Sequence, residues 1–194
     1  MKRVLTSFAT AALLALPAAP LSAQVASSPV RFGIMGGATL PLSDFKDIAK
    51  TGWNAGALVD IGLPLVPVSF RVDGQWHQLD GKTIGTATTD FRIIDGTANV
   101  LYTFGTAAPT KFYLIGGVGV YNLRAKVEDT GLGIDDSNSD TKFGLNAGAG
   151  FRFQLTGFST FIEARYHNIF SGFDNGSGDS KSLQMIPIVV GFTF

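Results

Sequence analysis

The chain has 194 residues, with no cysteine, 24 glycines, 16 phenylalanines and only 15% charged residues. Average chains contain about 7% glycine and about 25% charged residues, so glycine is in excess and charge is scarce. The absence of cysteine excludes disulfides, thiolate metal sites and a lipoprotein anchor, and the net charge of zero gives no argument for nucleic-acid binding.

The first 23 residues have the three parts of a secretory signal peptide. Lys2 and Arg3 form a basic end, a short apolar core follows, and the small-residue stretch "LSA" precedes Gln24. A membrane-spanning helix would need about 20 apolar residues, more than this stretch supplies. We therefore predict a signal peptide at 1–23, export, and one mature domain at 24–194.

Eight stretches of the remaining chain alternate between apolar and other residues, and none keeps a helical period. A period of two is typical of strands that face two different environments. The predicted strands cover 30–41, 53–63, 68–79, 91–104, 111–125, 141–155, 160–170 and 183–194. The sequence therefore predicts an all-β protein with eight strands.

The connections between these strands alternate in length. The first, third, fifth and seventh are long and polar, and they cover 42–52, 80–90, 126–140 and 171–182. The others are short and carry turn residues, and they cover 64–67, 105–110 and 156–159. This pattern predicts an antiparallel up-and-down barrel with four long loops at one end and tight turns with both termini at the other, as in bacterial outer-membrane barrels.

The two faces of most strands differ in chemistry. One face carries charges of both signs among glycines: Asp60, Arg71, Asp73, Arg152, Glu163 and Arg165. The other is apolar, with aromatic residues near its ends: Trp53, Trp76, Tyr102, Phe104, Phe112, Phe151, Phe153, Tyr166, Phe192 and Phe194. Aromatic girdles are expected on a lipid-facing surface, so we predict that the charged face lines the lumen. Residues 111–125 are apolar on both faces and their sides stay unassigned.

The chain ends in "QMIPIVVGFTF", in which alternate residues are apolar up to the last one. With this ending, the chain resembles the small eight-stranded outer-membrane barrel family, the porin-like proteins of the OmpA and OmpX type. The resemblance implies that the barrel-assembly machinery reads Ile186, Ile188, Val190, Phe192 and Phe194. It also implies a monomer in the bacterial outer membrane, surrounded by lipid and lipopolysaccharide. Pro187 departs from the pattern because it cannot donate to a strand ladder, and we expect it at a bulge or near the outer rim.

The charged residues and His167 are the candidate site. Eight strands leave an interior just wide enough for side chains, so we interpret the charges as a structural network and not as an ion path. Some barrels of the family deacylate lipid A with a "His-x-Ser-Asn" pattern, but Ile169 stands where the serine would be and Ser171 is displaced. We expect no enzyme, no cofactor and no metal site.

The expected function is structural or surface-recognising, through the four external loops, with slight permeability at most and no wide pore. The alternatives are a secreted soluble barrel that binds an apolar ligand inside, and a lipid A-modifying barrel enzyme.

Overall fold

The computed structural model describes residues 29–82, 87–105, 110–129, 136–174 and 180–194, so the predicted signal peptide lies outside the described residues. The elements in chain order are β1 (Val30–Leu42), α1 (Phe45–Ile48), β2 (Gly52–Gly62), β3 (Val68–Asp80), β4 (Ala87–Phe104), β5 (Thr110–Asp129), β6 (Asp136–Gln154), β7 (Ser159–Asp174) and β8 (Ser180–Thr193). Among the described residues, no helix is long and apolar enough to cross a membrane.

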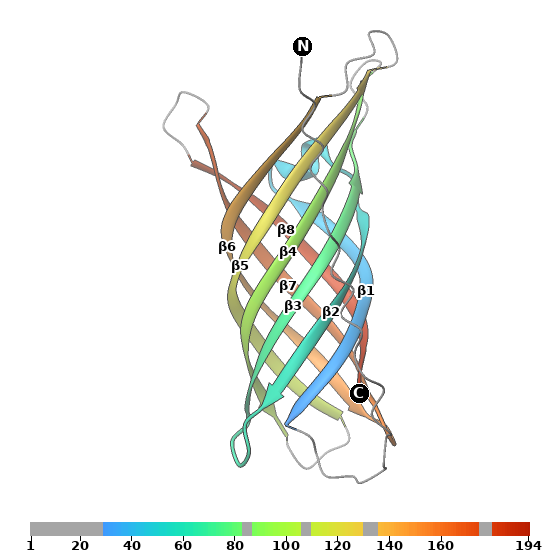
Figure 1. Cartoon of the computed structure of the whole chain (residues 1–194), viewed down its shortest axis with the longest axis vertical. Helices are drawn as coiled ribbons and strands as arrows, with labels where there is room; N and C mark the ends of the chain where they lie inside the picture. The colour runs from blue at the N-terminus through green and yellow to red at the C-terminus, as the bar shows by residue number, and fades with distance from the viewer. Residues whose placement is uncertain (1–28, 83–86, 106–109, 130–135, 175–179) are drawn as a thin grey trace, which may run out of the picture.

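The eight strands form one closed antiparallel barrel in which each strand pairs with its neighbours in sequence. β1 and β8 close it, in a ladder from Gly33 opposite Thr193 to Leu42 opposite Gln184. The short connections and the C-terminus lie at one end of the barrel (Figure 1), which we call the inner end, and α1 lies near the other, the outer end. Closure leaves no free sheet edge along the wall. The predicted fold is thus confirmed.

Burial alternates along the strands, as the sequence pattern predicted. In β3, Arg71 and Asp73 are buried in the lumen, whereas Phe70 and Val72 face outward and are 45% and 56% exposed. The period of two in the sequence therefore corresponds to a real difference between an inner and an outer face.

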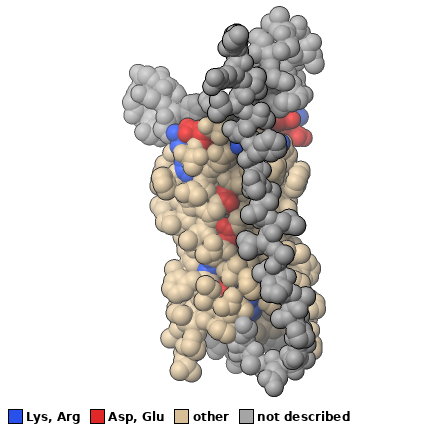
Figure 2. Space-filling view, viewed as in Figure 1, with Lys and Arg blue, Asp and Glu red and all other residues tan. Residues whose placement is uncertain are grey.

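The outer wall of the barrel is apolar and rich in aromatic residues. All ten aromatic residues predicted for the apolar face are outward and exposed. Those at the inner end form a belt, in which the ring centroids of Phe112 and Phe151 are 5.3 Å apart. On the face shown in Figure 2, most of the described wall is uncharged, and charged residues gather mainly toward the outer end. The apolar wall and polar lumen contradict the alternative of a soluble barrel with an apolar interior.

The structure assigns the strand whose faces the sequence left open. In β5, Tyr113, Ile115 and Tyr121 are buried in the lumen, and Leu114 and Val118 face outward. The inward residues are apolar as well, because they pack in small clusters with lumen residues of other strands. The side chains of β5 therefore still alternate between inside and outside, although the two faces do not differ in polarity.

Pro187 lies neither at a bulge nor near the outer rim, contrary to expectation. It is buried at mid-barrel and pairs with Thr39 of β1. On the β7 side the ladder is interrupted there, but it resumes in the same register, with Ala164 opposite Ile188 and His167 opposite Met185. The register shift of this pair of strands occurs further out, between Ile169 and Phe173.

Several strands run further outward than the alternation of apolar residues indicated. β4, β5 and β6 have 18, 20 and 19 residues, whereas β2 has 11. Their outer ends carry polar residues, and period-two hydrophobicity cannot detect a strand that is solvated on both faces. In Figure 1 these three strands rise together beyond the barrel wall.

Candidate functional site

The centre of the lumen is an ion-pair network. Arg71 of β3 donates from Nε and Nη2 to the two carboxylate oxygens of Asp60 on β2, at 2.6 and 3.1 Å, and from Nη1 to Glu163 Oε2 on β7 at 2.8 Å. All three side chains are completely buried. A buried charge is tolerated only when it is paired and hydrogen-bonded, and here the guanidinium bridges two carboxylates from opposite sides of the barrel.

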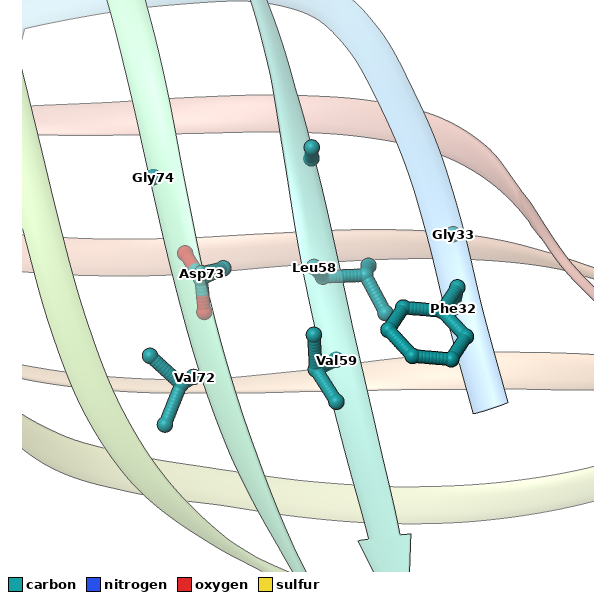
Figure 3. A pocket seen from close by; sticks show the side chains of 8 residues that line it. Phe32, Gly33, Leu58, Val59, Val72, Asp73 and Gly74 are labelled. Atoms are coloured by element: carbon teal, nitrogen blue, oxygen red, sulfur yellow. The ribbon is translucent and has the colours of Figure 1, made fainter. Parts of the chain in front are cut away.

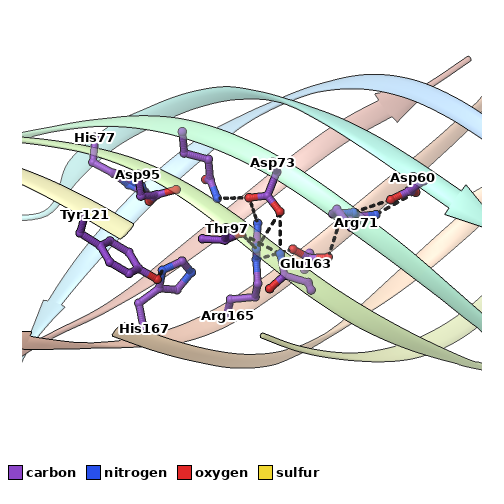
Figure 4. Close-up of polar contacts among 12 residues, drawn as sticks. Asp60, Arg71, Asp73, His77, Asp95, Thr97, Tyr121, Glu163, Arg165 and His167 are labelled. Carbon is purple, nitrogen blue, oxygen red and sulfur yellow. Dashed lines mark hydrogen bonds and ion pairs between the residues drawn. The ribbon is translucent and has the colours of Figure 1, made fainter. Parts of the chain in front are cut away.

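The network continues toward the outer end through Arg165. Its Nη2 and Nη1 donate to the Asp73 carboxylate at 2.9 and 3.1 Å, and its Nε lies 2.7 Å from Glu163 Oε1. At the inner side, Arg152 Nη2 donates to Asp60 Oδ2 at 2.5 Å. Figure 4 shows Asp60, Arg71, Glu163, Arg165 and Asp73 following one another along the axis.

The structure therefore brings together all six charged residues that the sequence singled out for the lumen. They are three guanidinium groups and three carboxylates, so the network is neutral as a whole: Arg71, Arg152 and Arg165 against Asp60, Asp73 and Glu163. Neutrality and direct pairing are the conditions under which charges survive in a narrow, poorly hydrated interior.

A second polar group lies above the network, and the sequence analysis missed most of it. His77 Nε2 is 2.8 Å from Asp95 Oδ2, and His77 Nδ1 is 2.7 Å from Thr39 Oγ1. Asn54 Nδ2 donates to the same Thr39 oxygen at 2.9 Å, so Thr39 links Asn54 to His77. Asp95 could have been found by counting along the strand, because the inward residues of β4 have odd numbers and so does Asp95.

His167, the last of the predicted site residues, is fully buried and contacts the phenol oxygen of Tyr121 at 2.9 Å through Nδ1. Figure 4 shows the pair in the lumen, near His77 and Asp95. Ile169, in the place of the deacylase serine, is also buried in the lumen, and the side chain of Ser171 lies outside those described. A base that acts on a membrane lipid must reach the outer wall or rim, and His167 faces neither.

The outer part of the lumen holds an apolar cluster. Phe45 is the first residue of α1, and Ala49 follows its last residue. Both pack on lumen residues of five strands: Leu79, Ile93, Tyr121, Ile169 and Met185. Main-chain bonds pin this connection to the end of β3, from Lys50 N to Asp80 O at 2.7 Å and from Lys82 N to Ile48 O at 2.8 Å. An apolar layer thus lies between the polar network and the outer end of the barrel.

Among the described residues, no group of three or more His, Cys, Asp or Glu side chains could hold a metal ion. Some buried atoms, such as both amide atoms of Asn146 and Nε2 of His167, have no protein partner within the described part of the chain, and these are positions that ordered water would satisfy.

A depression of about 480 Å³ lies over β1, β2 and β3. Figure 3 shows Phe32, Val59 and Val72 at its rim, and the small residues Gly33, Ala57 and Gly74 give it depth. It is apolar and lies on the exposed wall, so it is part of the apolar belt and not an entrance to the lumen.

Comparison with known proteins gives a consistent result. The family described as "Outer membrane protein beta-barrel domain" has a model that matches residues 11–194. No curated protein sequence matches the chain.

Solved structures show the same fold. Neisserial surface protein A is 20% identical, with a TM-score of 0.61 over 86% of this chain and 96% of that one. A major outer membrane protein of Thermus thermophilus is 13% identical, with a TM-score of 0.62 over 85% and 98%. The attachment invasion locus protein Ail of Yersinia pestis is 17% identical, with a TM-score of 0.51 over 84% and 95%.

Proposed function

The chain belongs to the outer membrane protein β-barrel domain family, and on that premise we propose that it presents a recognition surface outside the bacterial outer membrane. The surface is the sheet formed by the outer parts of β4, β5 and β6. The barrel beneath it acts as a sealed anchor.

The observation that carries this proposal is the length of the three strands. About 9–11 residues are enough for a tilted strand to cross a bilayer, and β2 has 11. β5 has 20 residues, so roughly half of it extends beyond the lipid on this estimate. A barrel that served only to seal or stiffen the membrane would not need this extension.

The projecting sheet has an open edge on β6. The β5–β6 ladder runs out to Val127 opposite Asp136, whereas the β6–β7 ladder ends at Gly144 opposite Ile169. Within the described residues, 136–143 therefore have a neighbouring strand on one side only. An unpaired strand edge offers a row of main-chain donors and acceptors to which a partner can add an extended segment.

Several described side chains of this region are polar and contact one another, whereas Phe143 on the open edge is apolar and 72% exposed. Asn122 Nδ2 donates to Ser139 Oγ and to Thr141 Oγ1, both at 3.1 Å, and Lys142 Nζ lies 2.7 Å from Asp140 Oδ2. Charges along an edge discourage unselective pairing between copies, which supports a selective partner.

We further infer that the lumen network is structural and that a wide pore is absent. The neutral chain of ion pairs across β2, β3, β6 and β7 ties opposite walls of the barrel together, and the α1 cluster covers it. We also propose that the last strand carries the assembly signal, that the barrel contacts lipopolysaccharide and that it is a monomer. The outward position of Ile188, Val190, Phe192 and Phe194 supports the assembly signal.

The test is a barrel whose projecting sheet has been trimmed. Arg124 and Ser139 are cross-strand partners, so residues 125–138 can be replaced by a two-residue Asn-Gly turn without a change of register. The control is Thr156→Asn, which gives the inner-end turn the same Asn-Gly pair without shortening a strand. Both variants must show the shift in gel mobility on boiling that marks a folded membrane barrel.

We expect the trimmed variant to lose autoaggregation and adherence of the producing bacteria to protein-coated surfaces, and the control to keep both. Detergent sensitivity of cells lacking the protein should be corrected equally by wild type and trimmed variant. If adherence is unchanged by trimming, the recognition proposal is wrong. If the trimmed variant fails to restore detergent resistance, the projecting sheet contributes to the integrity of the envelope and does not bind a partner.

A further inference from the structure

The inner mouth of the lumen holds three cationic side chains from three strands. Arg31 of β1 and Lys111 of β5 point into the lumen and are partly exposed, and Arg152 of β6 is buried just above them. Lys111 and Arg152 are direct cross-strand partners, and Arg31 lies close enough to both for their charges to repel one another. Like charges placed opposite each other destabilise a sheet unless something between them compensates.

The protein supplies little compensation at this end. Asp60 is the cross-strand partner of Arg31, and it is already bound by Arg71 and by Arg152. Because the central network is neutral with Arg152 included, its side chains hold no carboxylate in excess to balance Arg31 and Lys111. The inner connections 63–67, 105–109 and 155–158 contain no charged residue of either sign.

Arg152 adds a directional feature. Its side chain is 5% exposed, its Nη2 donates to Asp60, and its Nε is a buried donor without a partner among the described residues. The guanidinium also lies over the ring of Tyr113, 5.5 Å from the centroid, which holds its plane in place. An oriented guanidinium with a free donor, beside two reachable cations, has the features of an anion site.

We propose that Arg31, Lys111 and Arg152 bind a phosphate group at the inner mouth of the lumen. Arginine forks match the geometry of phosphate oxygens, and lysine adds a mobile point charge. The phosphate can come from free anion in the periplasm or from the headgroup of a phospholipid in the inner leaflet. The site lies at the opposite end of the barrel from the projecting sheet, so the test of this proposal is independent of the test of the recognition surface.

The experiment uses the full mature chain, labelled with ¹⁵N and folded in zwitterionic detergent micelles. Inorganic phosphate is titrated at constant ionic strength, with chloride as the comparison anion, and amide and guanidinium shifts are followed by NMR. The site variant is R31Q/K111Q, and the matched control is K46Q/K50Q, which removes two exposed lysines at the outer end. A second arm adds to phosphate-free sulfobetaine micelles either phosphatidylglycerol or a diacylglycerol, which has the same acyl chains without the phosphate.

We expect phosphate to shift the Arg152 Nε signal and its neighbours saturably in wild type and in K46Q/K50Q. In R31Q/K111Q the apparent affinity should fall about tenfold or more, since two charge-assisted contacts are lost. Shifts with phosphatidylglycerol alone identify the lipid headgroup as the source, and shifts with free phosphate identify the soluble anion. The proposal is overturned if neither form of phosphate shifts these signals more than chloride does, or if R31Q/K111Q binds like wild type.

Discussion

At the scale of single residues, the narrow lumen depends on aromatic rings lying flat over glycines of the next strand. Tyr113 of β5 is the cross-strand partner of Gly150 on β6, and Phe161 of β7 is the partner of Gly191 on β8. A Cβ atom at either glycine would meet the facing ring at 2.5 Å from Tyr113 Cζ or Phe161 Cε1, closer than carbon atoms approach. The excess of glycine in the sequence thus has a packing reason.

Gly150→Ala tests this packing. The new methyl group must displace Tyr113, whose hydroxyl donates to Glu163 at 2.7 Å, so we expect a loss of about 1–3 kcal/mol in the free energy of unfolding. The measurement is urea unfolding in micelles, followed by the fluorescence of Trp53 and Trp76.

The control is Gly116→Ala, on the outer wall of β5. A Cβ there has Asn146 O at 3.6 Å as its nearest neighbour, which is an ordinary contact. Alanine should be neutral or slightly stabilising at this position because it restricts the unfolded chain. Equal midpoints for the two variants would show that the ring of Tyr113 is free to move.

At the scale of elements, β8 both closes the barrel and carries the ending that resembles an assembly signal. Its ladders with β1 and β7 are antiparallel, and Phe192 and Phe194 point outward, 42% and 65% exposed. An outward aromatic at a strand end adds little to the packing of the finished barrel, so a large effect of its removal would have to arise during insertion.

We therefore expect Phe194→Ala to lower the amount of folded barrel in the outer membrane several-fold, with little change in the stability of the barrels that do form. The measurement is the ratio of unboiled to boiled gel bands in outer-membrane fractions, together with urea unfolding of the purified variant.

Phe32→Ala is the matched control, because Phe32 lies beside Phe194 on β1, is 60% exposed and exchanges main-chain hydrogen bonds with it. If both variants assemble equally well, the last residue is only part of the aromatic belt.

At the scale of the whole molecule, the barrel is stabilised by contacts across its lumen as well as by its ladders. Arg71 on β3 joins Asp60 on the next strand to Glu163 on β7, 92 residues away in sequence. Removing one partner of a buried ion pair leaves the others charged and unpaired, which is much more costly than removing the whole group.

Arg71→Met should accordingly reduce the free energy of unfolding by about 3–5 kcal/mol. Arg92→Met is the comparison, since Arg92 is exposed on the outer wall and stacks over Trp76 with its guanidinium 4.6 Å from the ring centroid. A loss of about 1 kcal/mol or less is expected there, because the cation–π contact is solvated.

The same urea titration measures both variants, and a double variant of Arg71→Met with Glu163→Gln should recover part of the loss by removing one orphaned charge. Equal losses in the two single variants would mean that water or other side chains replace Arg71, and that the network does not tie the walls together.

Much of the site could be predicted from the sequence because direction alternates along a strand. The inward placement of Asp60, Arg71 and Glu163 needs only their positions relative to apolar neighbours, and a slip of one residue would expose each charge to lipid. What could not be predicted was the identity of each partner. His77 looks isolated in the sequence because Asp95 lies on the next strand, and α1 is indistinguishable from a loop because it is a single turn.

The number of strands, their up-and-down order and the outward face of each amphipathic strand follow from the amino-acid pattern. These are local properties, set by a period of two residues. The lengths of the outer connections were predicted wrongly, because strands extend into three of the four that the sequence indicated to be long, 80–90, 126–140 and 171–182. The facing of β5, the outward reach of β4 to β6, the closure by α1 and the pairing of Arg71 with Glu163 emerge only in the folded barrel. Each of these depends on how far the ladders are staggered when β1 meets β8, and stagger is a property of the closed barrel and not of any one strand.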